Sequence, residues 1–205
     1  VHNLGAVMDP HLEMSQHVKS VCRGAFAGIR KIGQIRHYLN QDSTTRLVHA
    51  FVTTKLDACN SLIFGLQDSD ISKLQRVQNT AARLVLRASR CHHITPLLES
   101  LHWLPVKQRA IYKILLLTYK ALHGLSPVFI SDLLHVHIPS RTLRSSSECR
   151  LKVPRTRTKT YGDRTFAFAA ADMWNKLPKD IRQAASVNIF KSKLKTHLFK
   201  MHFCD

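Results

Sequence analysis

Carboxylates are scarce in this sequence, and their scarcity limits the chemistry that the chain can perform. Three Glu and ten Asp oppose 31 Lys and Arg, so the formal net charge is 31 − 13 = +18 before thirteen His are counted. Two-metal phosphoryl transfer needs carboxylates that converge on one point. Asp68 and Asp70 are the closest pair of acids, but they stand where a predicted helix begins, a position that capping and the helix dipole explain better.

Motifs that hold nucleophiles, metals or phosphates are also missing. The chain has no GxSxG, no HExxH, no P-loop and no other Gly-rich phosphate-binding loop. Cys91, His92 and His93 are adjacent, yet structural zinc needs ligands paired at CxxC-like or HxxxH-like spacing from two segments. We therefore expect no catalytic residues, no cofactor, no bound metal and no small-molecule substrate.

The five cysteines are scattered without a CxxC pair, which is typical of reduced thiols in the cytosol or nucleus. No secretory leader and no apolar run long enough to cross a bilayer is present. We expect a nuclear or cytoplasmic protein that is not secreted and does not enter a membrane. Because the chain begins at Val1 on a short apolar stretch, we also expect a fragment of a longer protein.

Glycine and proline are sparse, at seven each, which leaves room for long helices. Apolar residues recur at steps of three and four, the period of an amphipathic helix. The first such stripe consists of Val18, Val21, Cys22, Ala25, Phe26, Ile29, Ile32 and Ile35. The predicted helices cover residues 12–39, 44–57, 70–90, 105–123, 165–175 and 186–200, and short strands are expected at Leu4–Met8 and Leu151–Thr160. Predicted helix ends include the N-caps Ser43 and Ser186 and the terminating Gly124.

These elements predict a mainly α fold. A helical bundle comes first, and a second helical region with a basic loop or short β segment follows it. The helical pattern lapses around residues 90–96, so we place the boundary between the two regions near Arg90.

The predicted helix over residues 70–90 carries cations on one face. They are Lys73, Arg76, Arg83, Arg87 and Arg90, spaced 3, 7, 4 and 3 residues apart with no acid between them. At ~100° per residue they fall within a sector of about 100°. A solvated helix face normally mixes Glu with Lys to form i,i+4 pairs, so a stripe of one sign indicates contact with a phosphate backbone. The alternative is a face that serves only solubility.

A second basic feature spans residues 141–164, where eight Lys and Arg oppose two acids and the net charge is 8 − 2 = +6. As a strand, Arg155, Arg157 and Lys159 would project to one face, and Tyr161 beside them could stack on an unpaired base. Arg-rich loops also occur on basic surfaces that bind nothing specific, and this alternative stays open.

The charge of the whole chain favours a polyanionic partner, because a compact body with an excess of 18 positive charges repels itself. Nucleic acid is the leading candidate. An anionic membrane surface comes second, and a basic surface that only maintains solubility is the third alternative.

Several long phrases of the sequence carry a family resemblance. They are LVHAFVTTKLDACNSLIFGL (Leu47–Leu66), LQRVQNTAARLVL (Leu74–Leu86), ITPLLESLHWLPVKQRAIYKILLLTYKALHG (Ile94–Gly124), VPRTRTKTYGDRTFAFAAADMWNKLP (Val153–Pro178) and FKSKLKTHLF (Phe190–Phe199). In this order they resemble the region that follows the polymerase core of LINE-type (non-LTR) retrotransposon reverse transcriptases, above all the chicken-repeat and Jockey-like elements.

The resemblance implies an architecture and a role. Residues 1–10 would be the end of a palm-like strand, residues 11–90 a thumb-like helical unit that grips template–primer duplex, and residues 91–205 a basic C-terminal region that helps to hold element RNA and target DNA. The F/Y-x-D-D carboxylates of such polymerases are absent from this sequence. The chain is therefore expected to bind nucleic acid without being an enzyme, although its parent would be an RNA-directed DNA polymerase.

Two alternatives remain open at this point. The chain could be a stand-alone or domesticated basic RNA- or DNA-binding protein, or a small metal-dependent nuclease that uses His92, His93 and scattered aspartates. An upstream polymerase core in the same reading frame would favour the retrotransposon origin, and a scan of divalent metals would test for the nuclease.

Overall fold

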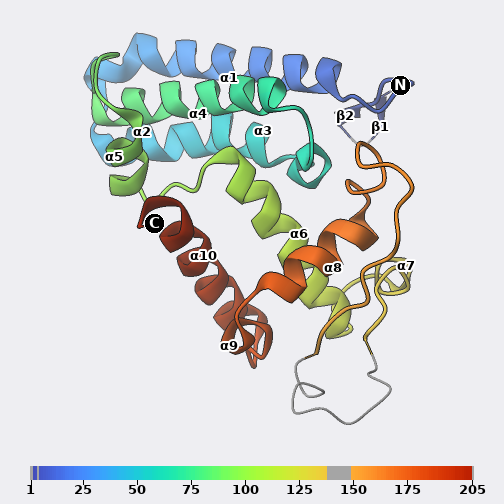
Figure 1. Ribbon diagram of the computed structural model, residues 1–205. Coiled ribbons are helices and arrows are strands. Elements are labelled where there is room, and N and C mark those ends of the chain that lie inside the picture. Colours follow the sequence, from blue (N-terminus) through green and yellow to red (C-terminus); the bar gives the residue numbers. More distant parts are fainter. Residues whose placement is uncertain (1, 4, 138–148, 205) are drawn as a thin grey trace. The chain divides into compact units, whose positions relative to one another are not determined.

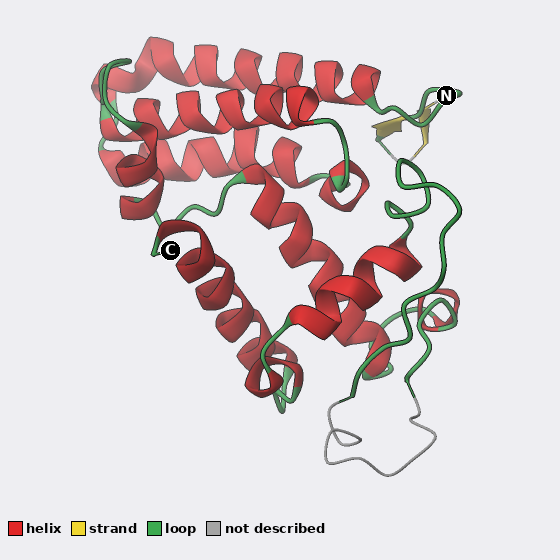
Figure 2. Ribbon diagram, viewed as in Figure 1, coloured by secondary structure: helices red, strands yellow, loops and turns green. Residues whose placement is uncertain are grey.

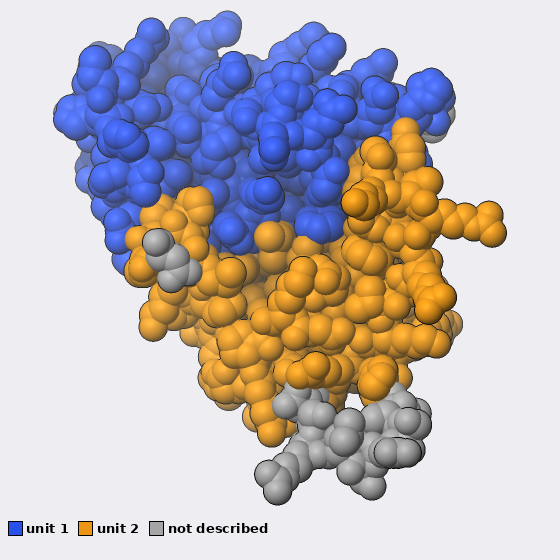
Figure 3. Space-filling view, in the orientation of Figure 1, with its two compact units in different colours: residues 1–110 blue, residues 111–205 orange. Residues whose placement is uncertain are grey.

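The computed structural model describes residues 2–3, 5–137 and 149–204 of the chain. Within these residues the protein is mainly helical (Figure 2), so the predicted fold class is confirmed. The chain divides into two compact units, Val1–Ala110 and Ile111–Asp205, which Figure 3 shows in different colours. Leu4 and residues 138–148, which include the first eight residues of the basic segment 141–164, lie outside the described residues.

The first unit is built on two long helices that run in the same direction. α1 (Ser15–Ile35) and α4 (Asp68–Leu86) lie side by side in Figure 1. They are joined near both ends, because Ser15 Oγ donates to Asp70 Oδ2 at 3.0 Å and Arg36 Nε donates to Leu84 O at 2.8 Å. Both helices bury apolar residues at helical spacing, namely Val18, Ala25, Ile29 and Ile32 of α1 and Leu74, Val77, Ala81 and Val85 of α4. The apolar period seen in the sequence is therefore the one that brings these helices together.

Shorter helical segments pack on this pair. They are a 3-10 turn (Arg36–Tyr38), α2 (Gln41–Val48), a π-helical turn (His49–Thr53), α3 (Thr54–Asp57), another 3-10 turn (Asn60–Ile63) and α5 (Ile94–Ser100). The helix predicted over residues 44–57 is present but begins at Gln41. Asn40 rather than Ser43 is its N-cap, since the Asn40 side chain accepts a hydrogen bond from Ser43 N at 2.8 Å.

The start of the chain forms a hairpin rather than the single strand that we predicted. β1 (His2–Asn3) and β2 (Ala6–Val7) pair antiparallel, and Gly5 between them has φ of +84°, a conformation that favours glycine. Asp9 then fixes the entry into α1. Its two carboxylate oxygens accept hydrogen bonds from Glu13 N and Met14 N, each at 2.8 Å.

The first unit extends about twenty residues beyond the boundary that the sequence placed near Arg90. Two side chains of α4 hold this extension. Gln78 Nε2 donates to Leu104 O at 2.8 Å, and Gln75 Oε1 accepts from Val106 N at 2.9 Å. α6 (Val106–Leu122) begins there, so the division between the units falls within this helix.

The second unit has an aromatic core. Besides the later part of α6 it contains α7 (Val128–Ser131), α8 (Phe166–Lys176), α9 (Lys179–Arg182) and α10 (Val187–Phe203), which Figure 1 labels. Phe190 of α10 stacks on Tyr119 of α6 at 4.3 Å and lies 5.9 Å from Trp174 of α8, as centroid distances. Two predicted helix ends are confirmed in this unit. Ser186 caps α10 by accepting from Ile189 N at 3.3 Å, and Gly124 follows α6 with φ of +66°.

The strand predicted at Leu151–Thr160 is wrong. Among the described residues only Leu151 takes part in β pairing there, through an isolated bridge to Val136, and residues 152–160 are not in a strand. Both backbone groups of Leu151 bond to the side chain of Asn175, with Leu151 N donating at 2.9 Å and Leu151 O accepting at 2.8 Å. Alternating residue types predict a strand, but a strand forms only where a neighbouring strand satisfies its backbone.

Candidate nucleic-acid interface

The cationic stripe of the predicted helix is divided in the structure. Lys73, Arg76 and Arg83 lie on α4, but the helix ends at Leu86 rather than near Arg90. Arg87 is left-handed, with φ of 51°, and Ala88 N donates to Arg83 O at 3.0 Å, a bond that closes a helix end. Arg90 lies in the turn that follows. The five cations therefore do not form one helical face.

Lys73 is engaged in an ion pair. Its Nζ lies 2.7 Å from Oδ1 of Asp70, whose side chain is only 6% exposed and whose other oxygen accepts from Ser15 Oγ. A buried carboxylate needs such a partner, because removing the partner leaves an uncompensated charge. We therefore assign Lys73 to the stability of the first unit and not to ligand contact. Arg76 is exposed on α4.

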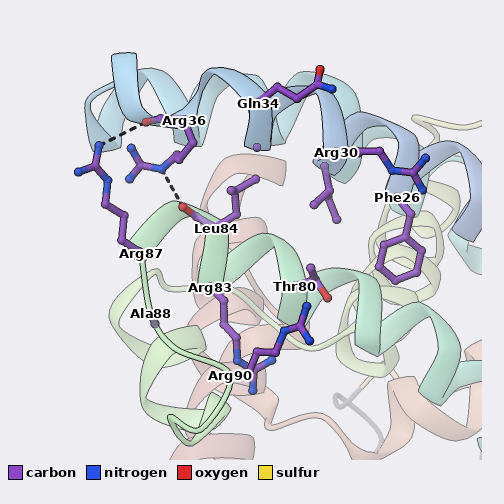
Figure 4. Close-up of a pocket in the computed structure, with 12 residues that line it drawn as sticks. Phe26, Arg30, Gln34, Arg36, Thr80, Arg83, Leu84, Arg87, Ala88 and Arg90 are labelled. Carbon is purple, nitrogen blue, oxygen red and sulfur yellow. Dashed lines mark hydrogen bonds between the residues drawn. The ribbon is translucent and has the colours of Figure 1, made fainter.

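Arg83, Arg87 and Arg90 line a groove between α1 and α4 with a volume of about 1080 Å³ (Figure 4). Arg30 of α1 and Arg36 of the following turn line it as well, and none of the acidic residues that the structure describes does. We call this feature the arginine groove, defined by Arg30, Arg36, Arg83, Arg87 and Arg90. Field lines from one sign of charge concentrate in a recess with low-dielectric walls, so this groove favours an anion.

Sequence reasoning missed the α1 side of the arginine groove. A signal was present, because no Asp or Glu occurs from Ser15 to Asn40. Lys19, Arg23 and Arg30 are spaced 4 and 7 residues apart, which places them on one side of a helix. The apolar stripe of the same helix predicts which side is buried, but it does not predict that the cations beside it line a groove.

The guanidinium of Arg36 serves the fold. It donates from Nε to Leu84 O at 2.8 Å, from Nη2 to Val85 O at 2.8 Å and from Nη1 to Leu39 O at 2.7 Å. A cation at the last carbonyls of α4 also complements the negative end of the helix dipole. Burial lowers the pKa of Arg36, and the positive charge of Arg87 lowers it further.

The other arginines of the groove are less engaged. Nη2 of Arg83 donates to His92 O at 3.4 Å, at the long limit of a hydrogen bond, while its Nε is buried without a partner among the described residues. Nη2 of Arg87 makes similarly long bonds to the carbonyls of Arg36 and Leu39, at 3.3 and 3.4 Å. Arg30 and Arg90 are exposed, and neither pairs with an acid in the part of the chain that the structure describes. Exposed guanidinium groups that are not engaged by acids are free to donate to an anionic oxygen, so the groove is chemically suited to a phosphate.

The predicted cations of the second unit are exposed, but not on a strand. Arg155, Arg157 and Lys159 lie in an irregular segment, and Tyr161 after them is 50% exposed. A tight turn follows, in which a Cβ at Gly162 would come within 2.5 Å of a carbonyl oxygen. The alternation that would have set the three cations on one face is therefore absent.

Other kinds of site find no geometric support in the described residues. No group of three or more His, Cys, Asp or Glu side chains there could hold a metal ion, and Cys91, His92 and His93 are exposed in a turn. None of the described helices has the length and apolar character needed to span a membrane. In comparisons with known proteins, no family model, no curated protein and no solved structure matches the chain.

Proposed function

We propose that this protein binds nucleic acid through the arginine groove. The observation that carries the proposal is a recess that five arginines line and that no acid among the described residues lines. Phosphate oxygens would accept hydrogen bonds from Arg30, Arg83, Arg87 and Arg90. Arg36 would instead hold the turn after α1 against the end of α4. Such contacts carry no base information, so binding would depend little on sequence.

The family resemblance extends this proposal to the origin of the chain. We propose a fragment of a LINE-type RNA-directed DNA polymerase whose first unit acts as a thumb, holding template–primer duplex or element RNA in the nucleus or cytoplasm. The fragment would have no catalytic activity of its own, since it lacks the paired carboxylates of the polymerase. The alternative is a stand-alone basic RNA- or DNA-binding protein, which could use the same groove.

A pair of matched variants tests the role of the groove. Replacing Arg30, Arg83 and Arg90 by Gln removes three positive charges from it. The control replaces three exposed lysines of the first unit that do not line the groove, Lys31, Lys55 and Lys107, also by Gln. Both variants have a net charge of 18 − 3 = +15, and helix propensities change little because Arg, Lys and Gln rank together.

Affinity is measured by titrating each protein into a labelled oligonucleotide at fixed salt. We expect the groove variant to bind on the order of 100-fold more weakly, because each lost hydrogen bond to a phosphate costs about 1 kcal/mol. The control should bind within a few-fold of the unmodified chain. Equal losses in the two variants would show that only net charge matters, and the proposed groove would be wrong.

A further inference from the structure

The arginine groove contains apolar surface that contacts to phosphates do not require. Phe26 belongs to the apolar stripe of α1, yet its side chain is 37% exposed and lines the groove, whereas Ile29 on the same stripe is only 8% exposed. Gly33, further along α1, also lines the groove, and a Cβ added there would meet no atom within 4 Å. The surface that α1 contributes to the groove is therefore apolar and unobstructed at Gly33, and the ring of Phe26 on the same helix is accessible.

Cations border this apolar surface from both helices. Arg30 follows Phe26 by four residues and therefore lies one turn further along the same side of α1. Figure 4 shows Phe26 and Arg30 toward one end of the groove and the bond from Arg36 to Leu84 toward the other, with Arg83 and Arg90 on the side of α4. An aromatic ring in a groove that guanidinium groups also line is suited to a strand whose bases are free to stack.

We propose that the arginine groove takes an unpaired stretch of nucleic acid, with one base stacked on Phe26 and the adjoining phosphates held by Arg30, Arg83 and Arg90. The inference rests on the proposed function and names the form of nucleic acid that the groove binds most tightly, since a duplex still offers its phosphates to the arginines. A regular duplex stacks its bases on one another and presents its phosphates outward, so it has no free base face to offer Phe26.

The test separates stacking from charge. The full chain is titrated with RNA and DNA oligonucleotides of about 12 nucleotides, within the roughly 4–16 nucleotides that a compact single-strand-binding fold covers, and with a duplex of the same length. Phe26→Leu keeps an apolar side chain but removes the aromatic face, and Phe26→Trp restores one. Phe51→Leu is the matched control, because Phe51 is 52% exposed in the same unit and does not line the arginine groove.

We expect Phe26→Leu to weaken binding of the unpaired strand by at least about fivefold, with duplex binding unchanged and with Phe26→Trp close to the unmodified chain. Phe51→Leu should change neither affinity. Equal binding of the unpaired strand by Phe26→Leu and the unmodified chain, or an equal loss for strand and duplex, would overturn the inference while leaving the proposed function intact.

Failure of the proposed function would appear separately, as an Arg30/Arg83/Arg90 variant that binds both ligands normally. Equal loss on RNA and DNA would assign the site to unpaired strands in general, and loss on one alone would assign it to that nucleic acid.

Discussion

Arg36 and Arg83 line the same groove, yet their guanidinium groups have different roles. Arg36 donates from all three of its side-chain nitrogens to backbone carbonyls at 2.7–2.8 Å, whereas Arg83 makes one long bond, and its Nε has no acceptor among the described residues. If Arg36 turned to a ligand it would lose three short hydrogen bonds, whereas Arg83 would lose only a long one. Residue type and exposure alone would assign both residues to the binding surface.

This distinction predicts that Arg36 is a stability residue. Arg36→Met keeps the apolar stem but removes every donor, leaving Leu84 O and Val85 O to water. We expect the free energy of unfolding to fall by about 1–3 kcal/mol, which lowers the Tm by several degrees at ~2–4 °C per kcal/mol. Thermal unfolding followed by circular dichroism measures the change. Arg46→Met is the control, because Arg46 pairs only with the exposed Asp42 and such pairs contribute at most about 1 kcal/mol. Equal Tm values for the two variants would contradict this role.

At the scale of elements, the N-terminal hairpin is held to α1 by a histidine that must stay neutral. Val7 N of β2 donates to Nδ1 of His17 at 3.4 Å, and the His17 side chain is only 3% exposed. Burial lowers the pKa of His17 below its ordinary value of 6.5. Protonation would place a second donor against the Val7 N–H and break the contact.

The sign of the pH dependence follows from that lowered pKa. Below about pH 6.5 the unfolded chain binds this proton more readily than the folded chain, so the free energy of unfolding decreases as the pH falls. The contribution of His17 to the free energy of unfolding is complete above about pH 6.5. Below that pH the contribution declines, by at most about 1.4 kcal/mol per pH unit. Urea unfolding at pH 7.5 and 5.5 should show a larger loss for the unmodified chain than for His17→Gln, in which this position does not titrate. Identical losses would exclude His17 as the cause, since the two proteins differ at this position alone.

The long helices could be predicted from the sequence because apolar period, caps and terminating glycine agree. α1, α4, α6 and α10 all lie where that period runs through the sequence. α5 was missed because it has only seven residues, too few for a period to emerge, and Pro96 near its start suggests a break. The end of α4 was misplaced because it depends on Arg36, 48 residues earlier in the chain, which bonds to Leu84 O. Local patterns do not contain such distant partners.

The candidate site could be predicted only in part for the same reason. Spacing identified the cations of α4 but not the ion pair that engages Lys73, which requires a buried Asp70 and therefore the packing of α1 against α4. Arg30 and Phe26 belong to the site because α1 packs beside α4, and the sequence of α1 alone does not show this packing. Helical period marks which side of a helix is apolar, but it does not show where a neighbouring helix stops covering that side, and Phe26 lies at such an edge.

At the scale of the whole molecule, a charge of +18 attracts any polyanion, whether or not a specific surface exists. Salt dependence separates the two effects. Cations that contact phosphates release counterions and steepen the dependence of affinity on salt, by about 0.9 in the log–log slope for each neutralised phosphate on duplex DNA. General attraction adds no such increment for a particular residue.

Three variants of equal net charge therefore differ in the log–log slope of affinity against salt concentration if the basic surfaces of this protein contact phosphates. One replaces Arg30, Arg83 and Arg90 of the arginine groove by Gln, one replaces Arg155, Arg157 and Lys159 of the second unit, and the control replaces Lys31, Lys55 and Lys107. We expect each of the first two to reduce the steepness on duplex DNA by about 2.7, three times the increment for one phosphate, and the control to leave the slope unchanged. Titrations from about 50 to 200 mM salt measure all three. A normal slope for the Arg155/Arg157/Lys159 variant would mean that this irregular basic segment is only solvated. If instead all three slopes shifted together, binding would follow net charge alone, and neither surface would be a contact site.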